Sequence, residues 1–463
     1  MQQQTPRGAF RAALASTALT LSALALTLAP GAAPAFELRL SAEGSAYAAL
    51  EPALQASAAT TFEHHVYIRE RGGLSHTLDF VAFGRYADGA EAVRKHADLR
   101  EFSYIRATRN SELRFGMARA FWGVTEAVHI VDILNQDDAL EDIDGEDKLG
   151  QPLLAGSYRL GPGRLGAVVL PRFRPREFGP GFRALSPFPI AAEQARYEDP
   201  RARKHVDYAL RWTQRLGDLD LGLSWFEGTG REPVLQPCAR AGSGRPGTSD
   251  TQANCDLGQA FAPPQTTPLE DAAIDLFALL GLGPSREELE QDFIEAAQAD
   301  VVLIPHYDQI RQLGLEAQWL QGNAAWKFEG RLREQRGERQ LAFAAGLEYS
   351  LGTFVNDLLD IGLLLEYLYD DRPANTYLTL FDDDIFIGTR ILGNDVAGTQ
   401  LLGGVIVDRD SRDLFWSLEA SRRLGGSTRL VFETRGLEPR GDSATGQLLD
   451  DIDQARLAWE LYF

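Results

Sequence analysis

The strongest constraint on the fold is an alternation of apolar and polar side chains in the last ten residues. Ala455, Leu457, Trp459, Leu461 and Phe463 share one face, and the other face is mostly polar or charged. Because successive side chains of a β-strand point to opposite faces, this pattern predicts a strand with one apolar and one polar face. A soluble sheet can present the same alternation, so the rest of the chain has to decide between the two.

Similar runs recur upstream, and most reach the roughly 9–11 residues that a tilted transmembrane strand requires. Eighteen runs can be counted, and the sequence therefore predicts an all-β fold, a closed antiparallel transmembrane β-barrel of about 18 strands, with 16 as the alternative. The runs lie near 36–46, 60–70, 74–86, 98–107, 111–120, 151–160, 164–171, 205–215, 219–227, 303–320, 323–334, 339–351, 358–370, 381–393, 398–408, 412–424, 427–436 and 452–463.

The connections between these runs alternate in length. Every second connection is short, as at 71–73, 161–163 and 216–218. Barrels of the Gram-negative outer membrane have short periplasmic turns and longer extracellular loops. This alternation predicts an outer-membrane location, among membrane lipid and lipopolysaccharide. The long connections all belong to the other set and lie at 121–150, 172–204, 228–302 and 437–451.

The first residues predict a cleaved signal peptide. Two arginines precede an uncharged run rich in Ala and Leu at 12–28, and Ala33-Pro34-Ala35 has the small-x-small pattern of a cleavage site. The alternative is a transmembrane anchor, but about 17 apolar residues are marginal for crossing a bilayer. We therefore expect a signal peptide at 1–35 and one barrel at 36–463.

The 228–302 connection is too long to be a simple loop. It holds Cys238 and Cys255, which we expect to form a disulfide in an oxidising compartment. Capping patterns at 267–270 and 285–288 predict two short helices, the first of them apolar. This connection would cap the barrel or, alternatively, plug it or receive a hydrophobic solute.

The 121–150 connection is strongly acidic and contains a single basic residue other than histidine, Lys148. Folded into the lumen, it would narrow the pore and favour cations. Outside the cell it would be a solvated loop, and the sequence favours neither placement. The candidate constriction residues are Glu126, Asp132, Asn135, Asp137 and Asp138 in this connection, and Lys327, Glu329, Arg331, Arg333, Glu366, Arg390 and Arg435 on predicted strands.

Several motifs resemble those of large, mostly uncharacterised proteobacterial outer-membrane barrels. The first is Trp-Gly-x-Thr-Glu at 122–126, followed by Val-Asp-Ile-x-Asn-x-x-Asp at 131–138. Similar stretches lie at 307–315, 366–372 and 388–395. The resemblance would span most of the mature chain. It implies barrel architecture and says little about the solute.

The end of the chain also resembles the terminal assembly signal of bacterial outer-membrane barrels, which ends in an aromatic residue. The matching residues are Trp459, Leu461 and Phe463. The resemblance implies that these residues are recognised by the barrel assembly machinery during biogenesis.

Charge and histidine placement narrow the function. A net charge of −20 argues against a nucleic-acid partner. The seven histidines are scattered without a catalytic motif, so we expect neither an enzyme nor a cofactor. The expected function is a porin-like channel for passive or selective passage of small solutes. The alternatives are an uptake or export barrel for a hydrophobic compound and a structural or adhesive barrel.

Overall fold

The computed structural model describes residues 35–47, 54–70, 72–87, 94–142, 145–179, 188–245, 247–256, 300–354, 358–372, 381–440 and 453–463. The predicted signal peptide up to residue 34 and both predicted loop helices lie outside these ranges. Within them, no helix is long and apolar enough to cross a bilayer.

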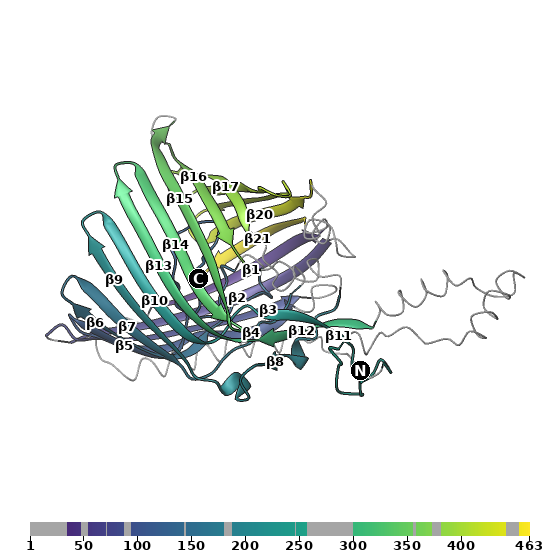
Figure 1. Ribbon diagram of the computed structural model, residues 1–463. Helices are drawn as coiled ribbons and strands as arrows, with labels where there is room; N and C mark the ends of the chain where they lie inside the picture. Colours follow the sequence, from purple (N-terminus) through teal and green to yellow (C-terminus); the bar gives the residue numbers. More distant parts are fainter. Residues whose placement is uncertain are drawn as a thin grey trace, which may run out of the picture.

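The described residues form a closed barrel of eighteen antiparallel strands (Figure 1). Each strand pairs with the next, and the last strand pairs with the first, with Arg39 opposite Tyr462. All eighteen predicted runs correspond to barrel strands, so the 18-strand prediction is confirmed and the 16-strand alternative is wrong. The strands are β1 (Ala35–Tyr47), β2 (Leu54–Arg69), β3 (Ser75–Ala87), β4 (His96–Ala107), β5 (Ser111–Ala118), β6 (Gln151–Leu160), β7 (Gly163–Leu170), β9 (Asp207–Leu216), β10 (Leu219–Thr229), β13 (Gln309–Gln321), β14 (Ala324–Gln335), β15 (Glu338–Phe354), β16 (Leu359–Asp370), β17 (Asp383–Gly393), β18 (Gln400–Asp408), β19 (Leu414–Arg423), β20 (Thr428–Glu438) and β21 (Gln454–Tyr462).

Short turns gather at one end of the barrel and the long connections at the other. Gly217 and Gly322 have φ values of 64° and 62°, a backbone region that glycine adopts without steric cost. They allow β9–β10 and β13–β14 to reverse direction tightly. The opposite end carries one equally tight connection, Arg336-Gly337 between β14 and β15. We call the two ends the turn end and the loop end.

The wall has the reverse of a soluble protein's polarity. On β13, Leu313 and Leu315 are 54% and 38% exposed, whereas Gln312 and Glu316, which flank them in the sequence, are almost fully buried. On β21, Leu457 and Trp459 are about half exposed at 49% and 52%. Apolar side chains therefore face outward and polar ones inward, as a barrel surrounded by lipid requires.

A closed barrel leaves no strand edge with unsatisfied backbone groups in the hydrocarbon layer. Together with the apolar outer face and the division into a turn end and a loop end, this is the architecture of a bacterial outer-membrane protein. The chain therefore lies in the outer membrane, and its outer face contacts membrane lipid.

A small second sheet covers part of the loop end. It consists of β8 (Arg196–Tyr197), β11 (Val234–Ala239) and β12 (Val301–Tyr307). The predicted run at 303–320 is therefore wrong as a single strand, because residues up to Tyr307 belong to this sheet and the barrel strand begins at Gln309. A disulfide joins Cys238 to Cys255 beside it.

Candidate functional site

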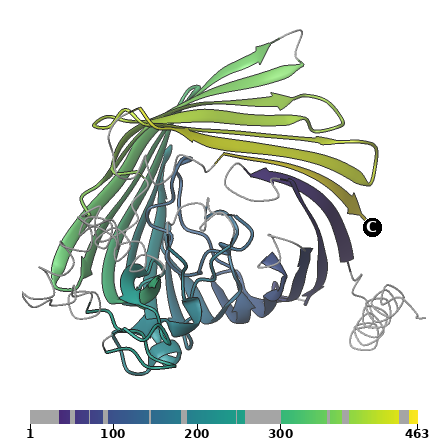
Figure 2. The same cartoon turned by 90° about the vertical axis from the view of Figure 1, so that its right-hand side faces the viewer.

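The segment between β5 and β6, described at residues 119–142 and 145–150, lies inside the barrel and is here called the lumen loop. Figure 2 shows this blue, irregular stretch of chain within the ring of strands. Its apolar residues Val131, Ile133 and Leu134 are buried in one cluster with Leu170 and Phe226 of the wall. Hydrophobic packing on β5–β10 thus holds one side of the lumen loop against the barrel.

Two predicted constriction residues anchor the backbone of the lumen loop. Glu329 on β14 accepts hydrogen bonds from the backbone N–H of Val124 at 2.5 Å and of Thr125 at 2.9 Å. Glu366 on β16 accepts from the N–H of Glu126 at 2.8 Å and of Ala127 at 2.9 Å. Both glutamates are almost completely buried. Their carboxylates therefore position the loop and do not stand free in the lumen.

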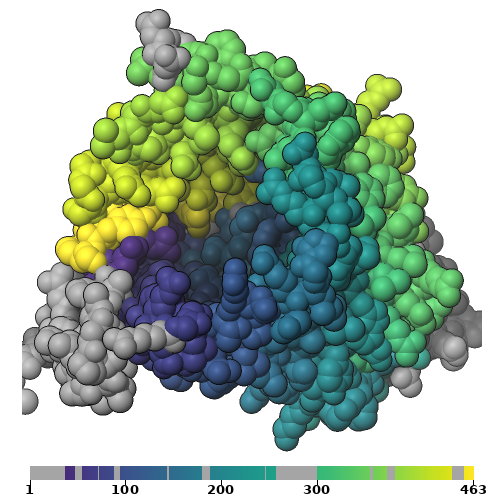
Figure 3. Space-filling view, turned by 90° about the vertical axis from the view of Figure 1, so that its left-hand side faces the viewer, coloured from purple at the N-terminus to yellow at the C-terminus, as the bar shows by residue number. Residues whose placement is uncertain are grey.

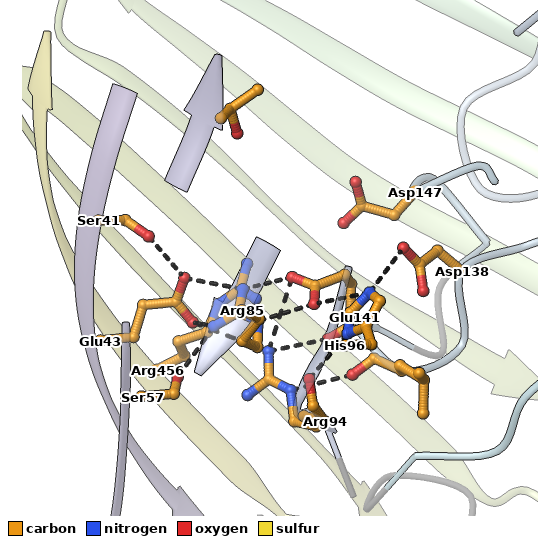
Figure 4. Close-up of polar contacts among 12 residues, drawn as sticks. Ser41, Glu43, Ser57, Arg85, Arg94, His96, Asp138, Glu141, Asp147 and Arg456 are labelled. Atoms are coloured by element: carbon orange, nitrogen blue, oxygen red, sulfur yellow. Dashed lines mark hydrogen bonds and ion pairs between the residues drawn. The ribbon is translucent and has the colours of Figure 1, made fainter. Parts of the chain in front are cut away.

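On the opposite wall, Arg85 of β3 forms the second anchor (Figure 4). Its guanidinium donates to Glu141 of the lumen loop at 2.7 Å, to Glu43 of β1 at 2.6 Å and to Ser57 of β2 at 2.9 Å. The Arg85 side chain is only 2% exposed. Arg94 lies beside it and donates to the carbonyl of Leu140 at 2.9 Å. Strands β1 to β3 are thereby tied to the middle of the loop.

Further predicted residues bridge the loop to the remaining wall. Arg435 on β20 contacts Asp142 at 2.6 Å. Arg390 on β17 forms an ion pair with Glu126, and Lys327 on β14 lies 3.9 Å from the same carboxylate. Asn135 closes the base of the loop, because its side-chain amide donates to the carbonyls of Ala118 and Leu149 at 3.0 and 2.8 Å.

Other acidic residues in the described part of the lumen loop also contact basic side chains. Lys148 lies 3.0 Å from Asp132 and 2.6 Å from Asp137. Asp138 lies 3.3 Å from Arg100 of β4. Burial raises the pKa of Asp132 above its usual value, and Lys148 only partly offsets this effect. The loop therefore presents a much weaker negative field than its composition suggests.

His129 links the lumen loop to itself and to the wall. Its Nε2 lies 2.9 Å from the Glu146 carboxylate, and its Nδ1 lies 4.0 Å from that of Glu329. Burial alone would lower the pKa of His129, but the two carboxylates outweigh burial and raise it to about 10. His129 is therefore a cation at neutral pH and helps to hold this part of the loop.

The lumen loop leaves open space on two sides. A cavity of about 1150 Å³ lies between the loop, residues 231–235, and strands β14 and β16 to β20. Another of about 600 Å³ lies between the loop and the wall around β1 and β18–β21. Figure 3 views the turn end and shows the molecule hollowed at its centre. The loop narrows this interior without filling it, and water and small solutes have space beside it.

The large cavity has two chemically different parts. Arg331, Arg333 and Arg372 line one part of it together with Glu232. Beside them, Leu368, Phe386 and Ile406 form an apolar cluster, extended by partly buried side chains that include Ile130 and Phe415. Among the described residues, no group of three or more His, Cys, Asp or Glu side chains is placed to hold a metal ion.

The sequence did not single out several residues that shape this interior. Strand alternation alone places Arg85 on an inward face, but no pattern shows that its partner is Glu141. Arg372 and Glu232 lie in connections, where no periodicity indicates direction. Of the predicted set, the structure brings Glu126, Lys327 and Arg390 together and places Arg331 and Arg333 in a different group.

No protein-family model and no curated protein matches the sequence. Solved barrels resemble it at low identity. OccK3 of Pseudomonas aeruginosa has a TM-score of 0.49 and 9% identity over 94% of this chain and 96% of that one. A loop-deletion mutant of OmpT, an outer membrane protein of Vibrio cholerae, has a TM-score of 0.43 and 9% identity, covering 94% and 100%. A mutant Rh. blastica porin has a TM-score of 0.39 and 9% identity, covering 93% and 100%.

Proposed function

We propose that the protein is an outer-membrane channel for the passage of small solutes, narrowed by the lumen loop. The observation that carries the proposal is the position of this loop. It is anchored on opposite walls and leaves a cavity of about 1150 Å³ beside it. A barrel of eighteen strands is in the size range in which a lumen remains for an aqueous path. The proposal requires no chemical step and no cofactor.

Single-channel recording tests this proposal directly. Purified full-length protein should produce discrete conductance steps in a planar bilayer, and the same preparation denatured by heat should produce none. Heat-dependent migration on a gel would establish that the tested protein is folded. Folded protein that inserts and carries no ionic current would contradict the proposal.

Cation preference is a finer part of the proposal. It is supported by Asp132, Asp137 and Glu146, which line the large cavity. Contacts with Lys148 and His129 reduce the field of these carboxylates, and Arg331, Arg333 and Arg372 line the same cavity, so we expect the preference to be modest.

The apolar cluster around Phe386 and Ile406 favours a second candidate, an uptake or export barrel for a hydrophobic compound. Its other support is the apolar helix predicted near 268–281, which lies outside the described residues. This candidate predicts saturable transport of an uncharged apolar compound into proteoliposomes. Equal leakage from protein-free liposomes would contradict it.

A further inference from the structure

Three guanidinium groups converge on one carboxylate in the large cavity. Arg333 and Arg372 each place a guanidinium nitrogen 2.7 Å from Oε2 of Glu232, and Arg331 places one 3.7 Å from the same oxygen. Arg331 and Arg333 lie two residues apart on β14 and therefore point to the same face. Asp370 lies 2.9 Å from Arg331 and 2.7 Å from Arg372. Three positive charges thus face two negative ones, and one of those two comes from a connecting segment.

The arginines are fixed, whereas Glu232 is open to the lumen. The side chains of Arg331, Arg333 and Arg372 are 6%, 3% and 8% exposed. The guanidinium of Arg333 also donates two hydrogen bonds to the side-chain oxygen of Gln312, from Nε at 3.0 Å and from Nη2 at 2.9 Å. Glu232 lies between β10 and β11, and its side chain is 40% exposed. A carboxylate of the chain itself therefore occupies a preformed basic pocket that a dissolved ion can approach.

Removing Glu232 from this position would leave the arginines with too little negative charge. Asp370 alone would then face three guanidiniums, which is unfavourable where water is partly excluded. An incoming anion would supply the missing charge and the same hydrogen bonds. A carboxylate suits the pocket because guanidinium groups bind it in a planar, two-pronged geometry.

The neighbouring wall determines what kind of anion fits. Leu368 lies two residues before Asp370 on β16, and Phe386 and Ile406 continue the apolar surface across β17 and β18. All of them line the same cavity as the arginines. An anion with an apolar body can place its charge on the guanidiniums while its body covers this surface.

We propose that Arg331, Arg333 and Arg372 form a binding site for amphipathic monocarboxylates, and that Glu232 occupies this site until such a solute displaces it. The proposal rests on the proposed function, because the solute reaches the site through the lumen. Glu232 acts as an internal competitor and weakens binding in proportion to the time it fills the site. A solute thus binds weakly enough to leave again, which passage requires.

Calorimetry with benzoate and the detergent-solubilised full-length protein tests the site without relying on conductance. Glu232→Gln should lower the apparent Kd for benzoate by about ten-fold, the gain expected if the competitor fills the site roughly nine-tenths of the time. Arg333→Gln should raise the apparent Kd. The matched control is Glu419→Gln, which removes a carboxylate that lines the same cavity from β19, a strand that carries none of the three arginines. It should leave the apparent Kd nearly unchanged.

Several outcomes would overturn the proposal. If no variant binds benzoate, the proposed site does not exist. An unchanged apparent Kd in Glu232→Gln would show that Glu232 does not compete with the solute. An equal gain in Glu419→Gln would show only a general effect of charge. Acetate or inorganic phosphate binding as tightly as benzoate would exclude an amphipathic carboxylate as the preferred ligand. If the native protein binds benzoate but carries no current, the channel proposal fails and the site stands.

Discussion

At the scale of single residues, the interior is organised by charges that are buried and paired. Arg85 contacts two carboxylates and a hydroxyl, and it is nearly inaccessible to solvent. Removing one member of such a group leaves the others buried without a partner, and this costs more than the intact contact contributes. The most sensitive positions are therefore the anchors of the lumen loop.

Arg85→Gln should release the middle of the lumen loop. The change leaves Glu43 and Glu141 without their main partner, a loss of roughly 3–5 kcal/mol by analogy with other buried ion pairs. We expect a larger and noisier single-channel conductance in a barrel that still shows heat-dependent migration. Arg215→Gln is the control, because Arg215 is 64% exposed and lies 3.9 Å from Asp220 at the turn end. A steady, native conductance in Arg85→Gln would show that this anchor does not restrain the loop.

Docking of the lumen loop should weaken at alkaline pH because of His129. Its pKa is raised to about 10 in the docked loop, against an ordinary value of 6.5. A raised pKa gives stabilisation that is complete below pH 6.5 and is lost progressively as the pH rises to about 10. Conductance noise should therefore increase between pH 7 and pH 10. In His129→Gln this increase should be absent, and an identical pH profile in both proteins would contradict the assignment.

Individual partners in the lumen could not be predicted from the sequence. Glu329 and Glu366 were correctly placed on inward faces by alternation, because charges avoid the lipid face of a barrel. Their partners Thr125 and Glu126 lie 204 and 240 residues away in the chain. Periodicity carries no information about contacts of this kind, so the sequence predicts these glutamates only as candidates for the constriction.

At the scale of elements, the strands were predictable because lipid and lumen impose opposite polarity on alternate residues. The run at 303–320 was misjudged for a physical reason. β12 alternates because one of its faces packs in the small second sheet, where Ile304 is buried near Cys238. Whether the lumen loop folds into the barrel or lies outside it could not be predicted, because an acidic sequence is compatible with both solvent and a pore.

Deleting Phe463 should impair assembly in the outer membrane. Its backbone N–H donates to the carbonyl of Leu38 at 3.0 Å, and its carbonyl accepts from the N–H of Leu38 at 3.2 Å. The deletion removes these two hydrogen bonds at the closing pair of strands, and it also removes the proposed recognition residue. Heat-modifiable protein in isolated outer membranes is the measurement, with Phe463→Tyr as the control. Normal amounts of membrane-integrated truncated protein would refute this role.

The disulfide should stabilise the loop end without being needed by the barrel. Cys238 and Cys255 are 17 residues apart. On the chain-entropy account, the bond lowers the conformational entropy of the unfolded chain and thereby stabilises the folded state by about 3 kcal/mol. Mass spectrometry of non-reduced peptides should find the two residues linked. In a variant carrying both Cys238→Ser and Cys255→Ser, proteolysis of the 228–302 connection should be faster and heat-dependent migration unchanged. Two free thiols in membrane-derived protein would disprove the link.

At the scale of the whole molecule, we expect the charges that line the lumen to set the ion preference of the proposed channel. Neutralising Asp132, Asp137 and Asp138 together by substitution with Asn leaves Lys148 and Arg100 charged. The reversal potential under a salt gradient should then shift toward anions. Screening over about 8–10 Å in physiological salt confines the effect to charges close to the conducting path. Native anion preference, or no shift in the triple variant, would place these carboxylates away from that path.

The pairing of β1 with β21 has a consequence for how the barrel assembles. Most neighbouring strands are joined by short connections and can pair as local hairpins. The contact of Arg39 with Tyr462 instead joins opposite ends of the chain. Contacts so distant in sequence form slowly, because a very long segment must be ordered first. Until they form, the molecule is an open sheet with two unpaired edges, which invite association with other chains. The barrel can therefore close only after β21 has paired with β1, and this pairing is the step that removes both edges.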